Sequence, residues 1–185
     1  MDPALRKRLR DALDREPAPR SSPGARIAAV LLPLIDADDP SMVFTRRTED
    51  LPRHPGEISF PGGMQEEADG GPRDAALREV EEELGIAPGA VEVLGALPRV
   101  HTVVSGILIV PFVGMLAVRP AFRPDAGEIA EVLEYPVSRL LDAETTVEWP
   151  IGDHMYRGFA YEMDGNTIWG ATAHILHDFL TTVKG

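Results

Sequence analysis

The sequence contains no cysteine and no excess of positive charge, and both absences narrow its function. Without cysteine the chain cannot form a disulfide, a thiolate zinc site, an iron–sulfur cluster or a cysteine nucleophile. The 18 Lys and Arg residues stand against 30 Asp and Glu residues, which gives a formal net charge of −12. Proteins that bind a nucleic-acid backbone usually carry a basic surface, so we expect no nucleic-acid partner. Anionic small molecules remain possible ligands where metal cations offset the repulsion.

Long apolar runs are also missing, because no segment reaches the ~18 uninterrupted apolar residues of a membrane-spanning helix. Residues 1–16 are heavily charged and lack the apolar centre of a signal peptide. We therefore expect no membrane partner and a cytoplasmic location. Four apolar residues can share one face of a short amphipathic N-terminal helix: Ala4, Leu5, Leu9 and Leu13.

A chain of 185 residues has the length of one domain. We divide it into an N-terminal helix and linker (residues 1–24) and a main domain (residues 25–185). Apolar runs and alternating patterns predict strands over 25–35, 42–46, 57–60, 91–97, 107–118, 156–163 and 167–169. Helices are predicted over 72–84, 136–141 and 171–183, and Trp169 and Phe179 are expected in the core. Strands on both sides of one central helix indicate a mixed α/β sandwich.

The helix predicted over residues 72–84 concentrates carboxylates where they repel one another. Its last two turns form the negative end of the helix dipole, which favours cations by roughly 0.3–1 kcal/mol each. Four glutamates stand there nonetheless: Glu79, Glu81, Glu82 and Glu83. All but Glu81 fall within about 100° of the helical wheel. A solvated acidic face is one explanation, and a hard divalent cation such as Mg²⁺ bound between the carboxylates is the other.

The residues around this helix favour the second explanation. Gly63 is followed by five residues and Asp69, and after eight more comes the run REVEEELGI over residues 78–86. This arrangement resembles the Nudix box, G-x5-E-x7-R-E-U-x-E-E-x-G-U, where U is aliphatic. The second half matches at every specified position, whereas the first half has Asp for Glu and one additional residue. Three acids are candidates for the first acidic position, which in the family holds the arginine, here Arg78: Glu66, Glu67 and Asp69.

Two further segments resemble the coenzyme A pyrophosphatases within the Nudix superfamily. Residues 43–63 read VFTRRTEDLPRHPGEISFPGG and are similar to that subfamily's pattern LLTxR…LxxHxGxIxFPGG. Residues 168–173 read IWGATA and are similar to its IWGxTA segment. The resemblance covers about residues 25–183. It implies the Nudix fold, an α/β/α sandwich with a mixed β-sheet and a catalytic loop–helix–loop.

The resemblance also implies an activity, the metal-dependent hydrolysis of the pyrophosphate bond of coenzyme A or its thioesters. The products would be 3′-phosphoadenosine 5′-phosphate and 4′-phosphopantetheine or its acyl form. Mg²⁺ or Mn²⁺ ions would orient the phosphates and activate water. The alternatives are a Nudix pyrophosphatase for ADP-ribose, NADH or nucleoside triphosphates, and a non-catalytic nucleotide-binding module. A homodimer is expected by analogy with the family.

The motif assigns roles to individual residues. The metal ligands would be the carboxylates of Glu79, Glu82 and Glu83 and a backbone carbonyl at Gly63, with Arg78 in the catalytic set. The general base would be a box glutamate or an acid from a distant loop, for which Glu128 is the candidate. Because Arg suits phosphate, Arg46, Arg47 and Arg53 are candidates for substrate binding. His54 is a further candidate because it lies inside the upstream segment that resembles the subfamily. His101 could reach the cleft, and the spacing of His174 and His177 is compatible with zinc but more often incidental.

Overall fold

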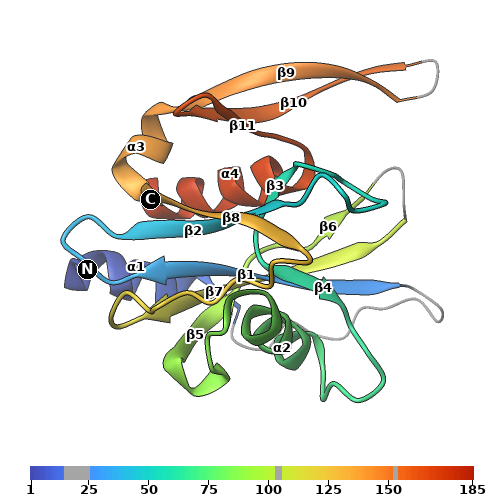
Figure 1. Cartoon of the computed structure of the whole chain (residues 1–185). Coiled ribbons are helices and arrows are strands. Elements are labelled where there is room, and N and C mark those ends of the chain that lie inside the picture. Colours follow the sequence, from blue (N-terminus) through green and yellow to red (C-terminus); the bar gives the residue numbers. More distant parts are fainter. Residues whose placement is uncertain (15–25, 103–105, 152–153) are drawn as a thin grey trace.

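The computed structural model describes residues 1–14, 26–102, 106–151 and 154–185, so the predicted linker at 17–24 lies outside the described residues. Figure 1 shows a central mixed sheet with helix α2 (Pro72–Leu84) on one face. Helix α4 (Gly170–Lys184) covers the other face, and a second, smaller sheet lies beyond it. The expected α/β class with a short N-terminal helix is confirmed.

Eight strands form the central sheet in the order β3-β2-β1-β7-β5, with β4 on β1, β6 on β7 and β8 on β2. Their bounds are β1 Ile27–Ile35, β2 Ser41–Arg47, β3 Ile58–Ser59, β4 Gly62–Met64, β5 Val91–Ala96, β6 Val100–His101, β7 Leu108–Leu116 and β8 Ile129–Pro136. The pairing of β1 with β7 is parallel and the other pairings are antiparallel. The predicted strands at 25–35, 42–46, 91–97 and 107–118 are therefore present with small changes at their ends.

The smaller sheet contains β9 (Glu144–Ile151), β10 (His154–Met163) and β11 (Asn166–Ile168) in the order β11-β10-β9. The turn between β10 and β11 has positive φ at Asp164 (52°) and Gly165 (81°), as a type I′ hairpin requires. The remaining helices are α1 (Pro3–Ala12) and α3 (Val137–Asp142), with a 3₁₀ turn at η1 (Pro88–Ala90). Among the described residues, no helix is long and apolar enough to cross a membrane.

Two hydrophobic cores lie on opposite faces of the central sheet. Alternate residues of β1 face each core, with Leu32 and Leu34 toward α4 and Leu31 toward α2. Phe179 is buried as expected, but Trp169 is 38% exposed, so its placement in the core was wrong. Trp169 is the N-cap residue of α4 and follows β11 in an extended conformation. Leu9 of α1 and its C-cap residue Leu13 are buried and Leu5 is partly buried, whereas Ala4 is exposed.

Candidate active site

Helix α2 presents its glutamates to three different environments. The helix begins at Pro72 and ends before Gly85, whose left-handed φ of 69° terminates it, as the sequence predicts. Val80 and Leu84 pack against the sheet. Glu83 is buried beside them, with 5% of the residue exposed. Glu79 is mostly covered, whereas 59% of the Glu82 side chain is exposed. The helical wheel predicted one shared arc, but the sheet buries only part of that arc.

The Glu83 carboxyl group is buried with few partners. Its Oε2 atom is buried and accepts no hydrogen bond. Burial is the main cause that raises the pKa of Glu83 to about 8, and the Glu79 and Glu128 carboxylates add to this effect. Arg47 and the Gly62 N–H oppose it. A buried carboxylate that lacks a partner is costly unless a cation or a proton neutralises it.

Glu79 lies directly against the backbone at Gly63. A Cβ atom on Gly63 would stand 2.4 Å from Oε1 and 2.7 Å from Oε2 of Glu79, so any larger residue there would displace the Glu79 carboxylate from this position. Burial raises the pKa of Glu79, and the Glu82 and Glu128 carboxylates act in the same direction, while Arg78 opposes them. Glu79, Glu83 and the Gly62-Gly63 turn therefore lie together in the fold.

Arg78 ties this helix to the preceding loop. Its Nε donates to Asp69 Oδ1 at 3.1 Å, and its Nη2 donates to the Met64 carbonyl at 3.1 Å. Nη1 lies 2.9 Å from Glu79 Oε1 and 2.8 Å from Glu82 Oε2. The hydrogen bond from Arg78 is the main cause that lowers the pKa of Asp69. Of the three acids that the sequence left open, Asp69 is the one that holds the arginine.

Glu128 comes from the loop between β7 and β8 and joins the same acidic region. Its charge raises the pKa of both Glu79 and Glu83. The backbone holds it there, because the Glu128 carbonyl accepts from Thr48 N–H at 2.9 Å at the end of β2. Asp125, which the sequence analysis missed, orders this turn, since its Oδ1 accepts from Gly127 N–H at 2.8 Å. The Asp-x-Gly spacing is a turn signal that could have identified it.

The two arginines at the end of β2 have different environments. Arg47 acts electrostatically on Glu83, and its Nε is buried without a hydrogen-bond partner. Arg46 is engaged elsewhere, with Nε 3.0 Å from Glu131 Oε2 and Nη2 2.6 Å from Asn166 Oδ1. The structure therefore brings Arg47, and not Arg46, to the acidic region.

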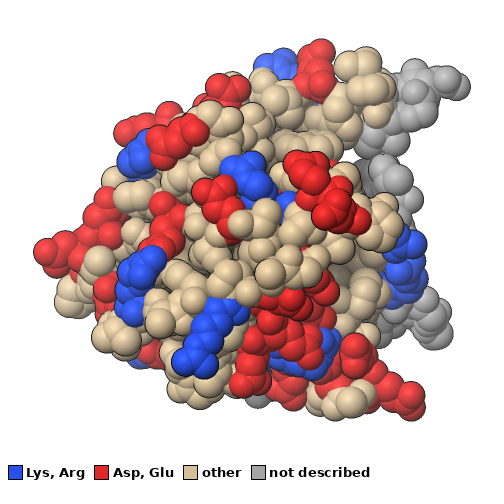
Figure 2. Space-filling model, in the orientation of Figure 1, with Lys and Arg blue, Asp and Glu red and all other residues tan. Residues whose placement is uncertain are grey.

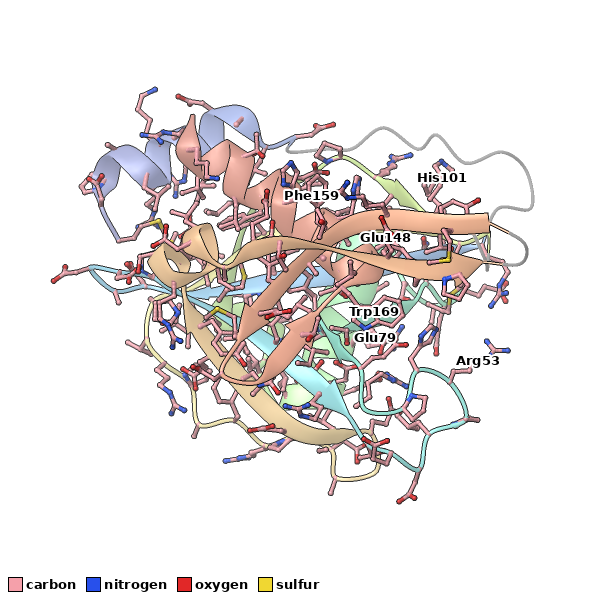
Figure 3. All side chains as sticks on the ribbon, turned by 90° about the horizontal axis from the view of Figure 1, so that it is seen from above. Arg53, Glu79, His101, Glu148, Phe159 and Trp169 are labelled. Carbon is pink, nitrogen blue, oxygen red and sulfur yellow. The ribbon has the colours of Figure 1, made fainter. Side chains whose placement is uncertain are left out.

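The other predicted site residues lie at the surface. Arg53 is exposed and lies at the margin of the molecule, away from Glu79 (Figure 3). His54 is exposed, and its Nδ1 lies 2.9 Å from Glu57 Oε2. His101 is exposed on β6. His177 stacks on Phe159, with ring centroids 3.7 Å apart, and bonds to Glu144, which gives it a structural role in the smaller sheet.

The acidic region carries more negative than positive charge. Figure 2 shows acidic side chains gathered over the part of the surface formed by α2, with few basic ones among them. In the described part of the chain, no three Asp, Glu or His side chains converge on a single point as metal ligands would. Glu82 and Glu79 turn instead toward Arg78. Glu79, Glu83 and Glu128 remain the carboxylates whose charges act on one another.

Comparison with known proteins decides what kind of site this is. A family model described as the NUDIX domain matches residues 25–156, which is most of the chain and includes all of α2. The chain belongs to the Nudix family. It is 36% identical to an uncharacterized Nudix hydrolase, NudL, of Pectobacterium atrosepticum over 163 residues, or 86% of this chain and 83% of that one. It is 35% identical to the uncharacterized NudL of Escherichia coli K12 over 156 residues, or 83% of this chain and 80% of that one.

Solved structures share the Nudix fold at low sequence identity. A MutT/nudix family protein from Enterococcus faecalis has a TM-score of 0.53 at 14% identity and covers 91% of this chain and 63% of its own. The E. coli ORF135 protein has a TM-score of 0.51 at 17% identity and covers 87% of this chain and 94% of its own. The family model and the sequence relatives make the chain a Nudix hydrolase, which acts on a pyrophosphate substrate, and the solved structures show that it has the fold. Nudix hydrolases generally use divalent metal ions.

Proposed function

We propose that this Nudix hydrolase cleaves the pyrophosphate bond of coenzyme A or its thioesters. The observation that carries the proposal is the position of the two segments that resemble coenzyme A pyrophosphatases. Residues from 43–63 and from 168–173 line one polar groove, although more than 100 residues separate them in the chain. That groove and the acidic region flank the same end of β2, because Arg46 faces one and Arg47 the other. A substrate held at both would place its pyrophosphate at the carboxylates.

The residues of the acidic region fit a divalent cation. Glu83 offers a buried carboxylate oxygen without a hydrogen-bond partner, and Glu79 lies beside the Gly63 backbone. Hard cations prefer such oxygen ligands. We assign Glu79 and Glu83 as the main ligands, with the Gly63 carbonyl and the exposed Glu82 completing the set. A bound Mg²⁺ or Mn²⁺ supplies charge neutralisation for the phosphates and lowers the pKa of a coordinated water.

The protein's own groups then have separate tasks. Arg78 orients Glu79 and Glu82 through its hydrogen bonds and is itself held by Asp69. Glu128 accepts the proton of the attacking water, since it is the acid outside the helix whose charge reaches the ligands. Arg47 faces the same carboxylates and is placed to bind a phosphate oxygen.

Three of the proposed substrate-binding residues act farther from the reaction. Arg46 is one wall of the groove, where its guanidinium is already engaged by Glu131 and Asn166. Arg53 and His54 are exposed on the loop that forms another wall, and either could meet the 3′-phosphate of coenzyme A from solvent. Charge screening makes these exposed contacts weak, so we expect them to affect KM more than kcat.

A substrate panel tests the proposal. The initial rates of hydrolysis of coenzyme A, acetyl-coenzyme A, dephospho-coenzyme A, ADP-ribose, NADH and nucleoside triphosphates are compared with Mg²⁺, with Mn²⁺ and with chelator. The expected result is the highest kcat/KM on coenzyme A or its thioester and no turnover in chelator. A higher kcat/KM on ADP-ribose, NADH or a triphosphate would replace the proposed substrate. Binding of nucleotides without hydrolysis of any would indicate a non-catalytic module.

A further inference from the structure

A groove of about 320 Å³ lies on the opposite side of β2 from helix α2. Strand β2, the loop after it and strand β3 form one wall, and the turn and strand that end at Trp169 form the other. The residues that line it are Arg46, Glu49, Gly56, Glu57, Asn166 and Trp169, among others. We call it the Trp169 groove.

Trp169 is unusually exposed for a tryptophan that lines a polar groove. It is 38% exposed although tryptophan is among the most apolar side chains, and the groove around it is mostly polar. Its ring meets that of Trp149 in a T-shaped contact, with the centroids 5.7 Å apart and the planes at 70°. This contact fixes the plane of the Trp169 indole before any ligand arrives. An exposed aromatic ring of fixed orientation is a stacking surface for a flat, aromatic ligand.

The charges of the groove select against phosphate. Among the described residues that line the groove, Arg46 is the one basic side chain, and its guanidinium is already bound by Glu131 and Asn166. Two carboxylates, those of Glu49 and Glu57, line the loop side. Carboxylates only accept hydrogen bonds, so they suit a ligand that offers N–H or O–H donors. The exocyclic amino group of adenine meets this requirement, and the flat purine ring suits the indole.

The groove is close enough to the acidic region to serve the same substrate. Arg46 lines the groove and Arg47 acts on Glu83, and the Cα atoms of consecutive residues are about 3.8 Å apart. A nucleotide whose phosphates lie at the carboxylates could therefore reach around the end of β2 into the groove.

From these observations we infer that the Trp169 groove binds the adenine base of the substrate, stacked on the Trp169 indole. The inference rests on the proposed function for the identity of the substrate. The other arm of coenzyme A, pantetheine, is a flexible chain with no aromatic ring and gains nothing from a fixed indole. Pantetheine is therefore expected to extend away from the groove.

Fluorescence of Trp169 tests the inference directly, because the chain has only two tryptophans. The Trp149→Phe variant of the full chain leaves Trp169 as the sole tryptophan. Its emission is followed in chelator during titration with AMP, with ribose 5-phosphate and with 4′-phosphopantetheine, up to millimolar concentrations. The expected result is saturable quenching by AMP and no response to the other two. No response to AMP, an equal response to ribose 5-phosphate, or a response to 4′-phosphopantetheine would each overturn the inference.

Calorimetric titration of AMP into further variants separates stacking from a structural effect. Trp169→Ala should weaken AMP binding roughly tenfold or more, and Trp169→Phe should weaken it less because a ring remains. Tyr156→Ala is the matched control, since Tyr156 is a similarly exposed aromatic residue (36%) outside the groove, and its affinity for AMP should be unchanged. Equal AMP affinity in Trp169→Ala and in the unmodified chain would contradict the inference.

The binding experiments and the substrate panel fail independently. If AMP quenches Trp169 but another adenine nucleotide is the best substrate, the groove assignment stands and the coenzyme A proposal falls. If coenzyme A is the best substrate and AMP has no effect on Trp169, the proposed function stands and the groove assignment falls.

Discussion

Asp125 is bonded directly to the end of the helix that carries the glutamates, since its backbone N–H donates to the Glu83 carbonyl at 3.0 Å. The nearby Arg123 N–H donates to the Leu84 carbonyl at 2.8 Å. These carbonyls belong to the last turn of α2, where no further helical N–H is available to them. The loop that carries Glu128 and the helix that carries Glu83 are therefore held as one unit.

This connection predicts a role for the Asp125 side chain in positioning Glu128. Asp125→Ala removes the acceptor for Gly127 N–H and should lower kcat roughly 10-fold with little change in KM, as loss of a supporting residue does. Asp125→Asn keeps an acceptor oxygen and should restore most of the rate. Asp39→Ala is the control, because Asp39 accepts from Ser138 in the same way but outside the acidic region. Steady-state kinetics on the three variants check this prediction. Equal kcat values for Asp125→Asn and Asp125→Ala would contradict the role of the Asp125 side chain.

The buried carboxylate of Glu83 predicts a loss of activity on substitution. Glu83→Gln keeps the shape but weakens a metal ligand, so kcat should fall by more than the roughly 10- to 100-fold typical of residues that only support ligands. Glu81→Gln, an exposed position on the same helix, should leave the rate unchanged. Initial rates at saturating Mg²⁺ check both variants, and near-normal turnover by Glu83→Gln would exclude Glu83 as a ligand.

Glu83 also predicts how stability depends on pH when chelator keeps metal away. Its pKa is about 8 in the folded chain against a usual value of 4.5, so the folded state binds more protons between these values. The protein's free energy of unfolding should therefore fall as the pH rises from 4.5 toward 8, and this contribution should level off above pH 8. Glu83→Gln should lack this contribution and unfold a few degrees higher at pH 8. Melting curves of both proteins from pH 5.5 to 8.5 with EDTA check this, and parallel pH profiles would contradict it.

The pairing of Asp69 with Arg78 predicts which loop acid matters. Asp69→Asn weakens the charge-assisted hydrogen bonds that hold the arginine, and kcat should fall roughly 10- to 100-fold. Glu67→Gln should have no effect, because Glu67 is exposed and its side chain has no hydrogen bond to Arg78. The hydrolysis rates of the two variants under identical conditions show which of the two acids, Asp69 or Glu67, supports Arg78. A larger loss for Glu67→Gln would reverse the assignment.

The sequence predicted the helix of the site to the residue, because Pro72 and Gly85 bound it and its charges break the rules for a surface helix. It did not predict strands β8 and β9. Both carry glutamates between their apolar residues, and both are held by pairing with another strand, β8 with the distant β2 and β9 with β10. Local patterns cannot identify a strand whose stability comes from such pairing.

For the residues around the site, too, the sequence predicted what depends on local spacing and missed what depends on the rest of the fold. Spacing along α2 was enough to bring Glu79 and Glu83 together, but it could not show that Glu82 would face solvent. Arg46 and Arg47 are adjacent in the chain and equivalent by composition. In the structure the register of β2 is irregular between these two residues. Arg46 bonds to Asn166, whereas Arg47 acts on Glu83.

The central claim is that Glu79 and Glu83 bind the divalent cation on which hydrolysis depends. Its most direct test is a crystal of the protein soaked in Mn²⁺ and measured at a wavelength where manganese scatters anomalously. The account predicts an anomalous peak within coordination distance of carboxylate oxygens of both Glu79 and Glu83. A map with manganese bound elsewhere, or with these two carboxylates apart and no peak between them, would contradict it.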